Sequence, residues 1–135
     1  MNPPSKDIAK WIAAQADPYS GIGTFAGDDP FSVYCAVEPA EPNDVVTVYD
    51  TGGAGPDTDD LSLCNVTFQV RVRCETYSEG YSIQEIIRDM LLTSEPVCET
   101  SSFAGVAMTT DVVAIGRDEN NRHLLTANYS AIRNI

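Results

Sequence analysis

The most constraining feature of this 135-residue chain is a strict alternation over residues 65–74, Asn-Val-Thr-Phe-Gln-Val-Arg-Val-Arg-Cys. Apolar side chains occupy every second position from Val66 to Cys74, and polar or basic side chains lie between them. A period of two in a run rich in β-branched residues predicts a strand with one buried face and one polar face. Arg71 and Arg73 fall on the polar face.

A helix is predicted directly after this strand. Thr76 and Glu79 have the spacing of a capping box, in which each side chain hydrogen-bonds the backbone amide of the other residue. Apolar residues then recur at helical spacing and form one stripe, Ile83, Ile86, Ile87, Met90 and Leu91. The simplest arrangement packs this stripe on the apolar face of the strand, and we expect the other elements to be added to that pair.

The N-terminal residues predict a first helix. Ser5 is a suitable N-cap after two prolines, and Asp7 places negative charge in the first turn, where it complements the helix dipole. The helix is expected to stop at Asp17, because a residue that precedes a proline avoids the α conformation.

Further strands are predicted on both sides of the central pair. Residues 31–37 and 45–49 are expected to form an antiparallel pair, and the later candidates are residues 103–109, 112–116 and 123–132. The order is helix, three strands, helix, then two or three strands. It predicts one α+β domain over residues 1–135, with a mainly antiparallel sheet and both helices packed on one face.

A glycine-rich acidic segment, residues 50–61, is expected to be a long loop. It lacks the lysine and helix start of a phosphate-binding loop and the ligand ladder of an EF-hand. Its Asp-Thr-Gly triplet also occurs in aspartic proteases, where a second copy has to supply the other carboxylate. We expect instead a partner-facing loop that orders on assembly, with the candidate residues Asp50, Gly52, Gly53, Asp57, Asp59 and Asp60.

Composition excludes some classes of function. The 20 acidic and 8 basic residues give a net charge of −12, which disfavours binding to a nucleic-acid backbone. Solubility is the general explanation of so much acid. No apolar run is long enough to cross a bilayer, so we expect no membrane association and a chain made and kept in the cytoplasm.

The inventory of reactive residues is sparse. Cys35, Cys64, Cys74 and Cys98 lack metal-binding spacing, and His123 is the single histidine. We therefore predict no metal site, no cofactor and no catalytic residues. A hydrolase that uses Asp50 or His123 stays open as an alternative, although no nucleophile motif accompanies either residue and no substrate follows from the sequence.

Several segments taken together resemble the tail terminator, or minor capsid protein, family of long-tailed bacteriophages. They are Val-Val-Thr-Val-Tyr-Asp-Thr-Gly-Gly at residues 45–53, Pro-Asp at 56–57, and Phe-Gln-Val-Arg-Val-Arg at 68–73. Tyr77 and Tyr81 at the start of the helix follow, and then residues 116–118, 122–123 and 128–129. The resemblance covers most of the chain, although residues 94–102 have no counterpart in it.

This resemblance implies a structural virion protein at the junction of head and tail, assembled in the host cytoplasm. Its expected partners are further copies of itself in a ring, typically six, together with the tail tube protein and the head-completion (neck) protein. The ring would cap the head-proximal end of the tube, end its polymerisation and offer a docking surface. DNA would pass through the lumen without specific binding.

Under this interpretation Arg71, Arg73 and Arg117 are candidate subunit-interface residues. An arginine can bind a carboxylate of the next subunit through two parallel hydrogen bonds. Pairing of Arg71 and Arg73 within their own subunit is an equally weighted alternative. For the whole protein, the alternative is a small acidic cytoplasmic binding or adaptor protein without catalytic activity.

Overall fold

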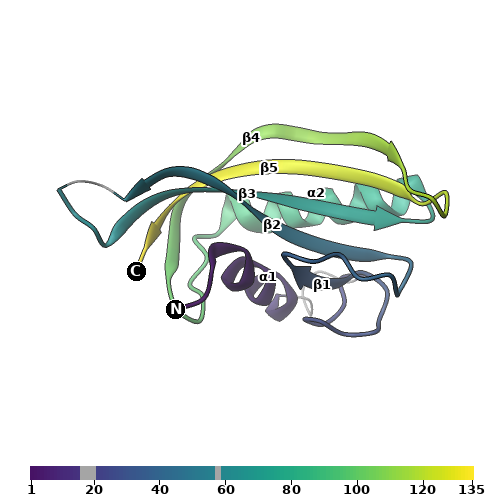
Figure 1. The fold of residues 1–135 in the computed structure, drawn as a ribbon, viewed down its shortest axis with the longest axis horizontal. Helices are drawn as coiled ribbons and strands as arrows, with labels where there is room; N and C mark the ends of the chain where they lie inside the picture. The colour runs from purple at the N-terminus through teal and green to yellow at the C-terminus, as the bar shows by residue number, and fades with distance from the viewer. Residues whose placement is uncertain (16–20, 57–58) are drawn as a thin grey trace.

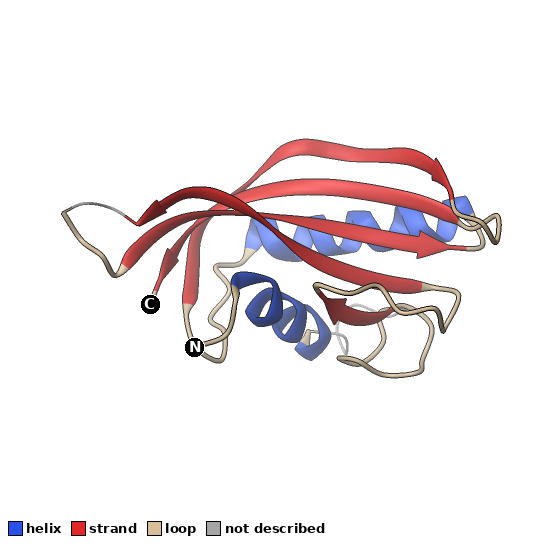
Figure 2. Ribbon diagram, in the orientation of Figure 1, coloured by secondary structure: helices blue, strands red, loops and turns tan. Residues whose placement is uncertain are grey.

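The computed structural model describes residues 1–15, 21–56 and 59–135. In these residues two helices, α1 (Pro4–Ala14) and α2 (Tyr77–Thr93), accompany a five-stranded sheet. The strands are β1 (Ser32–Cys35), β2 (Val45–Pro56), β3 (Leu63–Cys74), β4 (Ser102–Arg117) and β5 (His123–Asn134), in the spatial order β1-β2-β3-β5-β4. Both helices lie on the same side of the sheet (Figures 1 and 2), which confirms the predicted α+β class.

The predicted pairing of β3 with α2 forms the centre of the core. The alternating apolar residues of β3, from Val66 to Cys74, are buried, and the stripe of α2 packs in the same cluster. Phe68 stacks on Tyr129 of β5 with ring centroids 5.3 Å apart. Helix α2 begins after Thr76 as predicted, but the Thr76 side chain makes no capping hydrogen bond, so the expected capping box is wrong.

The predicted cap of α1 is also wrong. Pro3 is the N-cap and Pro4 is the first helical residue, a position that suits proline because no amide donor is needed there. Ser5 instead donates its backbone N–H and its hydroxyl to the Asp50 carboxylate, at 2.9 and 2.6 Å. The predicted stop at Asp17 lies outside the described residues.

Asp7, expected to act through the helix dipole, is a fully buried ionic centre. Its carboxylate accepts hydrogen bonds from Asn2, Thr100 and Ser101 and lies 3.1 Å from an Arg133 guanidinium nitrogen. Burial opposes its ionisation, but these hydrogen bonds outweigh burial and lower the pKa of Asp7 below its ordinary value. The network joins α1 to the end of β5 and to the segment before β4.

The expected antiparallel pairing of residues 31–37 with residues 45–49 is wrong, because β1 pairs with β2 in parallel, Ser32 beside Val45 and Cys35 beside Val48. No tight hairpin joins them. Residues 36–44 instead run back along the sheet, so that β2 starts beside the start of β1. The chain reverses at Ala36, whose φ of 66° is the left-handed conformation used in turns.

Residues 50–61 are not one long loop. Strand β2 continues to Pro56 and pairs with β3, with register shifts after Asp50 and after Gly52. Glycines with positive φ at 52, 53 and 55 permit these bulges. A Cβ on Gly53 would lie 2.2 Å from the Asn65 carbonyl oxygen, so the close approach of the two strands requires glycine there. We call β2 residues 51–56 with β3 residues 63–67 the arm.

The last two strands form a long hairpin. The separate strands predicted at residues 103–109 and 112–116 are one strand, β4, which pairs with β5 through four register shifts. Because β4 has 16 residues and β5 has 12, the bulges absorb the difference in length. The predicted last strand, residues 123–132, is present and extends to Asn134.

Candidate assembly surface

The face of the sheet that the helices leave uncovered carries mostly polar side chains. Side-chain hydrogen bonds link neighbouring strands there: Gln69 to Asn128 at 3.1 Å and Thr51 to Thr67 at 2.7 Å. Arg71 and Arg73 lie on this face, as the alternation predicted. We call it the open face.

Arg73, a candidate interface residue, is engaged inside its own subunit. Its guanidinium donates to the carbonyl oxygens of Pro39 at 2.6 Å and Pro42 at 2.6 Å, and to those of Ala40 and Asn43 at 3.3 and 3.1 Å. It also lies 3.4 Å from the Glu38 carboxylate, and the residue is 2% exposed. The structure therefore favours the within-subunit alternative for this arginine.

Arg71 is more accessible and makes one weaker ionic contact. Its Nε lies 3.3 Å from the Glu38 carboxylate without a hydrogen bond between them, and its side chain is 26% exposed. Glu38 therefore makes ionic contacts with both arginines of β3. Arg71 keeps part of its guanidinium available at the open face.

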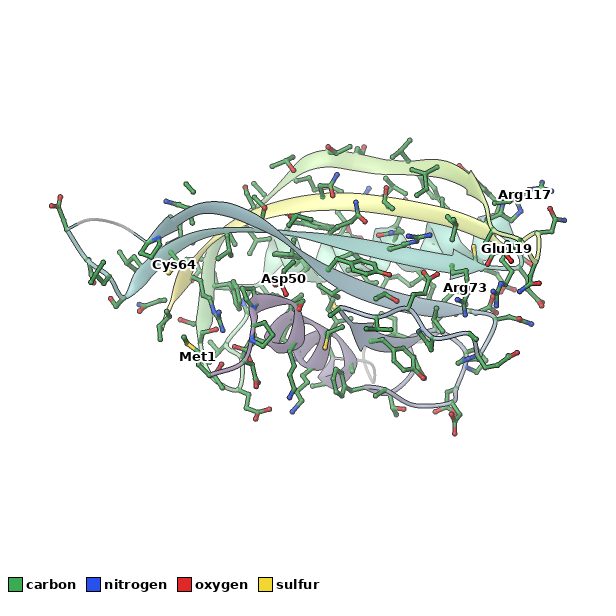
Figure 3. The ribbon with its side chains drawn as sticks, viewed as in Figure 1. Met1, Asp50, Cys64, Arg73, Arg117 and Glu119 are labelled. Atoms are coloured by element: carbon green, nitrogen blue, oxygen red, sulfur yellow. The ribbon has the colours of Figure 1, made fainter. Side chains whose placement is uncertain are left out.

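Arg117, at the end of β4, is exposed, and its hydrogen bond goes to the neutral Asn121 side chain at 3.0 Å. Figure 3 shows it at the end of the molecule that also carries Glu119. Arg122, in the same hairpin, also holds this region together, and we did not predict that role from the sequence. It pairs with Asp118 at 2.8 Å and donates to the Ala40 carbonyl, so it helps Arg73 to hold residues 38–43.

The candidate residues of the predicted partner-facing loop lie in different environments. Asp50 faces α1, where it accepts from Ser5 (Figure 3), while Gly52 and Gly53 are exposed in the arm. Asp60 accepts from the Ser62 hydroxyl and backbone N–H, which lowers its pKa. Asp59 is exposed, and Asp57 lies outside the described residues. Leu61, beside them, is 74% exposed.

The hydrolase alternative named Asp50 or His123 as its reacting residue, and the fold places these two residues far apart. Asp50 is paired with Phe68 and His123 with Cys74, six residues apart along β3, which corresponds to roughly 20 Å. His123 lies edge-on to the Tyr77 ring, with centroids 5.6 Å apart. The two side chains therefore belong to different sites.

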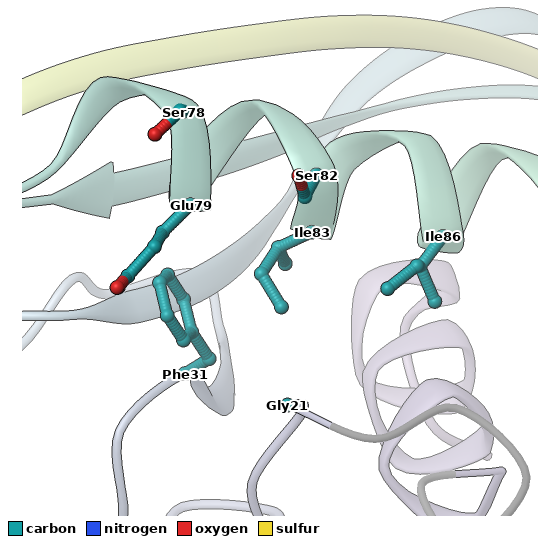
Figure 4. A pocket seen from close by; sticks show the side chains of 7 residues that line it. All are labelled: Gly21, Phe31, Ser78, Glu79, Ser82, Ile83 and Ile86. Carbon is teal, nitrogen blue, oxygen red and sulfur yellow. The ribbon is translucent and has the colours of Figure 1, made fainter.

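A hollow of about 360 Å³ lies between the first turns of α2 and residues 21–31 (Figure 4). Phe31, Ile83 and Ile86 form its apolar wall, and Ser78, Glu79 and Ser82 form its polar rim. The two serines have no imidazole beside them among these lining residues, so the hollow lacks the nucleophile and base pair of acyl transfer.

Strand β4 forms one edge of the sheet and is exposed along most of its length. Val113 and Ile115 are 46% and 54% exposed, and Asp111 is the only charged residue between positions 102 and 116. Large exposed aliphatic side chains on a strand with few charges are typical of a protein contact surface.

Comparison with known protein families found a match over nearly the whole chain. The model of the family described as Bacteriophage tail terminator protein matches residues 7–135. No curated protein sequence matches the chain. No helix in the described part of the chain has the length and apolarity needed to span a membrane. Because the family match covers all but the first few residues, the chain belongs to the bacteriophage tail terminator family.

Proposed function

We propose that this protein forms a ring, of six copies as the family resemblance implies, on the head-proximal end of the phage tail tube. The ring ends polymerisation of the tube and provides the surface on which the head-completion protein docks. Membership of the tail terminator family is the observation that carries this proposal. The protein acts through shape and surface contacts, so it works as a structural protein of the virion.

The accessible surfaces support an assembly role. No described helix covers the open face or the arm, and β4, although α2 contacts it, is exposed along most of its length. Together they offer surfaces for the tube, the neck protein and the neighbouring subunit. Of the three candidate interface arginines, Arg117 is the most exposed, because Arg73 is buried and Arg71 is half-buried. We assign the partner-facing role of the acidic segment to the arm beyond Asp50, since Asp50 itself holds α1.

The negative charge of the protein supports the proposal that DNA passes through the ring without binding. Six subunits of −12 carry a formal charge of −72, so any part of this charge that lines the lumen repels the phosphate backbone. DNA would then pass without binding. Neutralising acids that face the lumen should slow or trap genome ejection, and unchanged ejection kinetics would count against this role.

The proposal is tested with phage that lack this gene. Their tail tubes should vary in length and remain without heads, and purified protein added to tubes of normal length should bind at one end only. Negative-stain microscopy with a gold-labelled protein measures both results. Label along the tube or at its host-facing tip, or tubes of normal length in the mutant lysate, would contradict the proposal.

A further inference from the structure

The distribution of charge limits where two copies of this protein can touch. Each copy carries 20 acidic residues, and identical acidic surfaces repel one another. Residues 102–116 of β4 form a long exposed strip with a single charge, at Asp111. The exposed Val113 and Ile115 gain from losing contact with water. Strand β4 is therefore a surface on which another copy can pack against a single acid, at Asp111.

A second edge, without charged residues at positions 51–56, lies at the opposite end of the strand order. β1 covers only Val45–Val48 of β2, and the outer side of β1 is itself covered through a bridge from Phe25 to Val33. Residues 51–56, Thr-Gly-Gly-Ala-Gly-Pro, continue β2 beyond β1 and have no strand beside them among the described residues. The same holds for the outer side of β4, which is last in the strand order.

We propose that β4 of one subunit packs against residues 51–56 of the next, so that each subunit uses one edge to bind and the other to be bound. Because the two edges are different surfaces at opposite ends of the strand order, the contact is head-to-tail. Repetition of such a contact closes a ring when the rotation between successive subunits adds up to a full turn. This inference rests on the proposed ring and names the surfaces that build it.

The bulges of β4 limit how much backbone hydrogen bonding its contact with residues 51–56 can include. Its four register shifts interrupt the edge, so the two strands cannot share a long regular hydrogen-bond ladder. Side-chain packing of Val113 and Ile115 and short stretches of backbone pairing remain. The glycines of residues 51–56 leave their backbone open, since a Cβ on Gly52 or Gly55 would meet no atom within 4 Å. A neighbouring strand can therefore approach closely there.

Cysteine cross-linking of mixed variants tests the inference. Ala107→Cys places a thiol on β4 and Ala54→Cys places one on the arm, both at exposed positions. The two proteins are mixed and oxidised, with each variant alone and the wild type as controls for the native cysteines. Because each protein carries only one of the two new thiols, a disulfide between the two new thiols has to join two molecules. We expect dimers in the mixture, and in each variant alone only the wild-type background.

The remaining outcomes separate this inference from the ring itself. A self-linked dimer of Ala107→Cys alone would show a symmetric β4 contact and overturn the head-to-tail arrangement. No specific cross-link, with a wild type that is oligomeric by light scattering, would overturn the inference and leave the ring standing. A wild type that stays monomeric and unlinked at high concentration would overturn both.

A matched pair of charge substitutions supplies a second measurement. Val113→Glu on β4 should abolish assembly, because it adds an acid to the proposed contact. Leu92→Glu on α2 is the control, since Leu92 is 44% exposed against 46% for Val113. Circular dichroism should show both variants folded, and light scattering should show only Leu92→Glu at the wild-type mass. Assembly of Val113→Glu at wild-type mass would overturn the role of β4.

Discussion

Arg71 and Arg73 occupy the same face of one strand, two residues apart, and their surroundings differ. Arg73 donates to four backbone carbonyls of residues 39–43, whereas Arg71 has one misaligned ionic contact with Glu38. A guanidinium has five donors in a rigid fork, and Arg73 uses them to satisfy a loop that makes few regular backbone bonds. The Arg73 side chain therefore provides residues 38–43 with hydrogen bonds that a helix or strand partner would otherwise provide.

Alanine substitutions of Arg71 and Arg73 should distinguish the buried arginine that holds a loop from the partly exposed one that does not. Arg73→Ala leaves buried carbonyls and Glu38 without their donor, and we expect a loss of about 3 kcal/mol in the free energy of unfolding. Arg71→Ala removes a partly exposed, misaligned ion pair and should cost less than about 1 kcal/mol. Urea denaturation of both variants measures the difference. Equal small losses would show that the carbonyl contacts contribute little.

The sequence predicted the face of both arginines and could not predict their partners. Alternation places a side chain on one side of a strand, because the period of two fixes that geometry locally. The loop that covers Arg73 comes from residues 38–43, some 30 positions earlier, and its path depends on the parallel pairing of β1 with β2. The same limit explains Ser5, whose partner Asp50 lies 45 residues away.

At the scale of elements, Gly80 lets α2 lie close to the sheet. It stands inside the helix, and a Cβ there would lie 2.2 Å from the Cys74 sulfur and 2.8 Å from a Leu125 methyl carbon. Gln84, one turn later, donates to the carbonyls of Val70 and Leu125. These contacts set the helix directly on β3 and β5.

Gly80→Ala should destabilise the protein although alanine favours helices. Helix propensity alone would add about 1 kcal/mol of stability. The clash with Cys74 and Leu125 should cost about 1–3 kcal/mol, so after the gain in helix propensity we expect a net loss of up to about 2 kcal/mol. Ser82→Ala, exposed on the same helix, is the control and should stabilise by a few tenths of a kcal/mol. Thermal unfolding compares them, and a Gly80→Ala variant more stable than wild type would contradict the close packing.

Elements with strong local patterns were predicted well, and those that depend on distant partners were not. The β3 alternation and the α2 stripe fix their own structure through periodicity. Residues 51–56 have the composition of a loop, and they form a bulged strand because β3 supplies a partner. Likewise, β4 was predicted as two strands, because its bulges interrupt the alternation that would have joined them.

At the scale of the whole molecule, the ionic contacts leave little positive charge on the surface. Of the eight basic residues, six make ion pairs within the described part of the subunit: Lys10, Arg71, Arg73, Arg88, Arg122 and Arg133. Attraction between opposite charges of different subunits is therefore limited, while repulsion among their acids is not. We therefore expect the proposed assembly to depend on surfaces with few charges, such as β4.

This balance predicts that salt strengthens assembly. Raising NaCl from about 0.05 M to about 0.5 M shortens the Debye length to a few ångströms, which screens the repulsion between subunits of −12 and leaves the burial of apolar surface intact. Sedimentation velocity should show the oligomer fraction rising with salt at constant protein concentration. The Val113→Glu variant should show little oligomer at either concentration of salt. If the ring were held mainly by ion pairs such as one from Arg117, salt would dissociate it, and a falling oligomer fraction would decide for that mechanism.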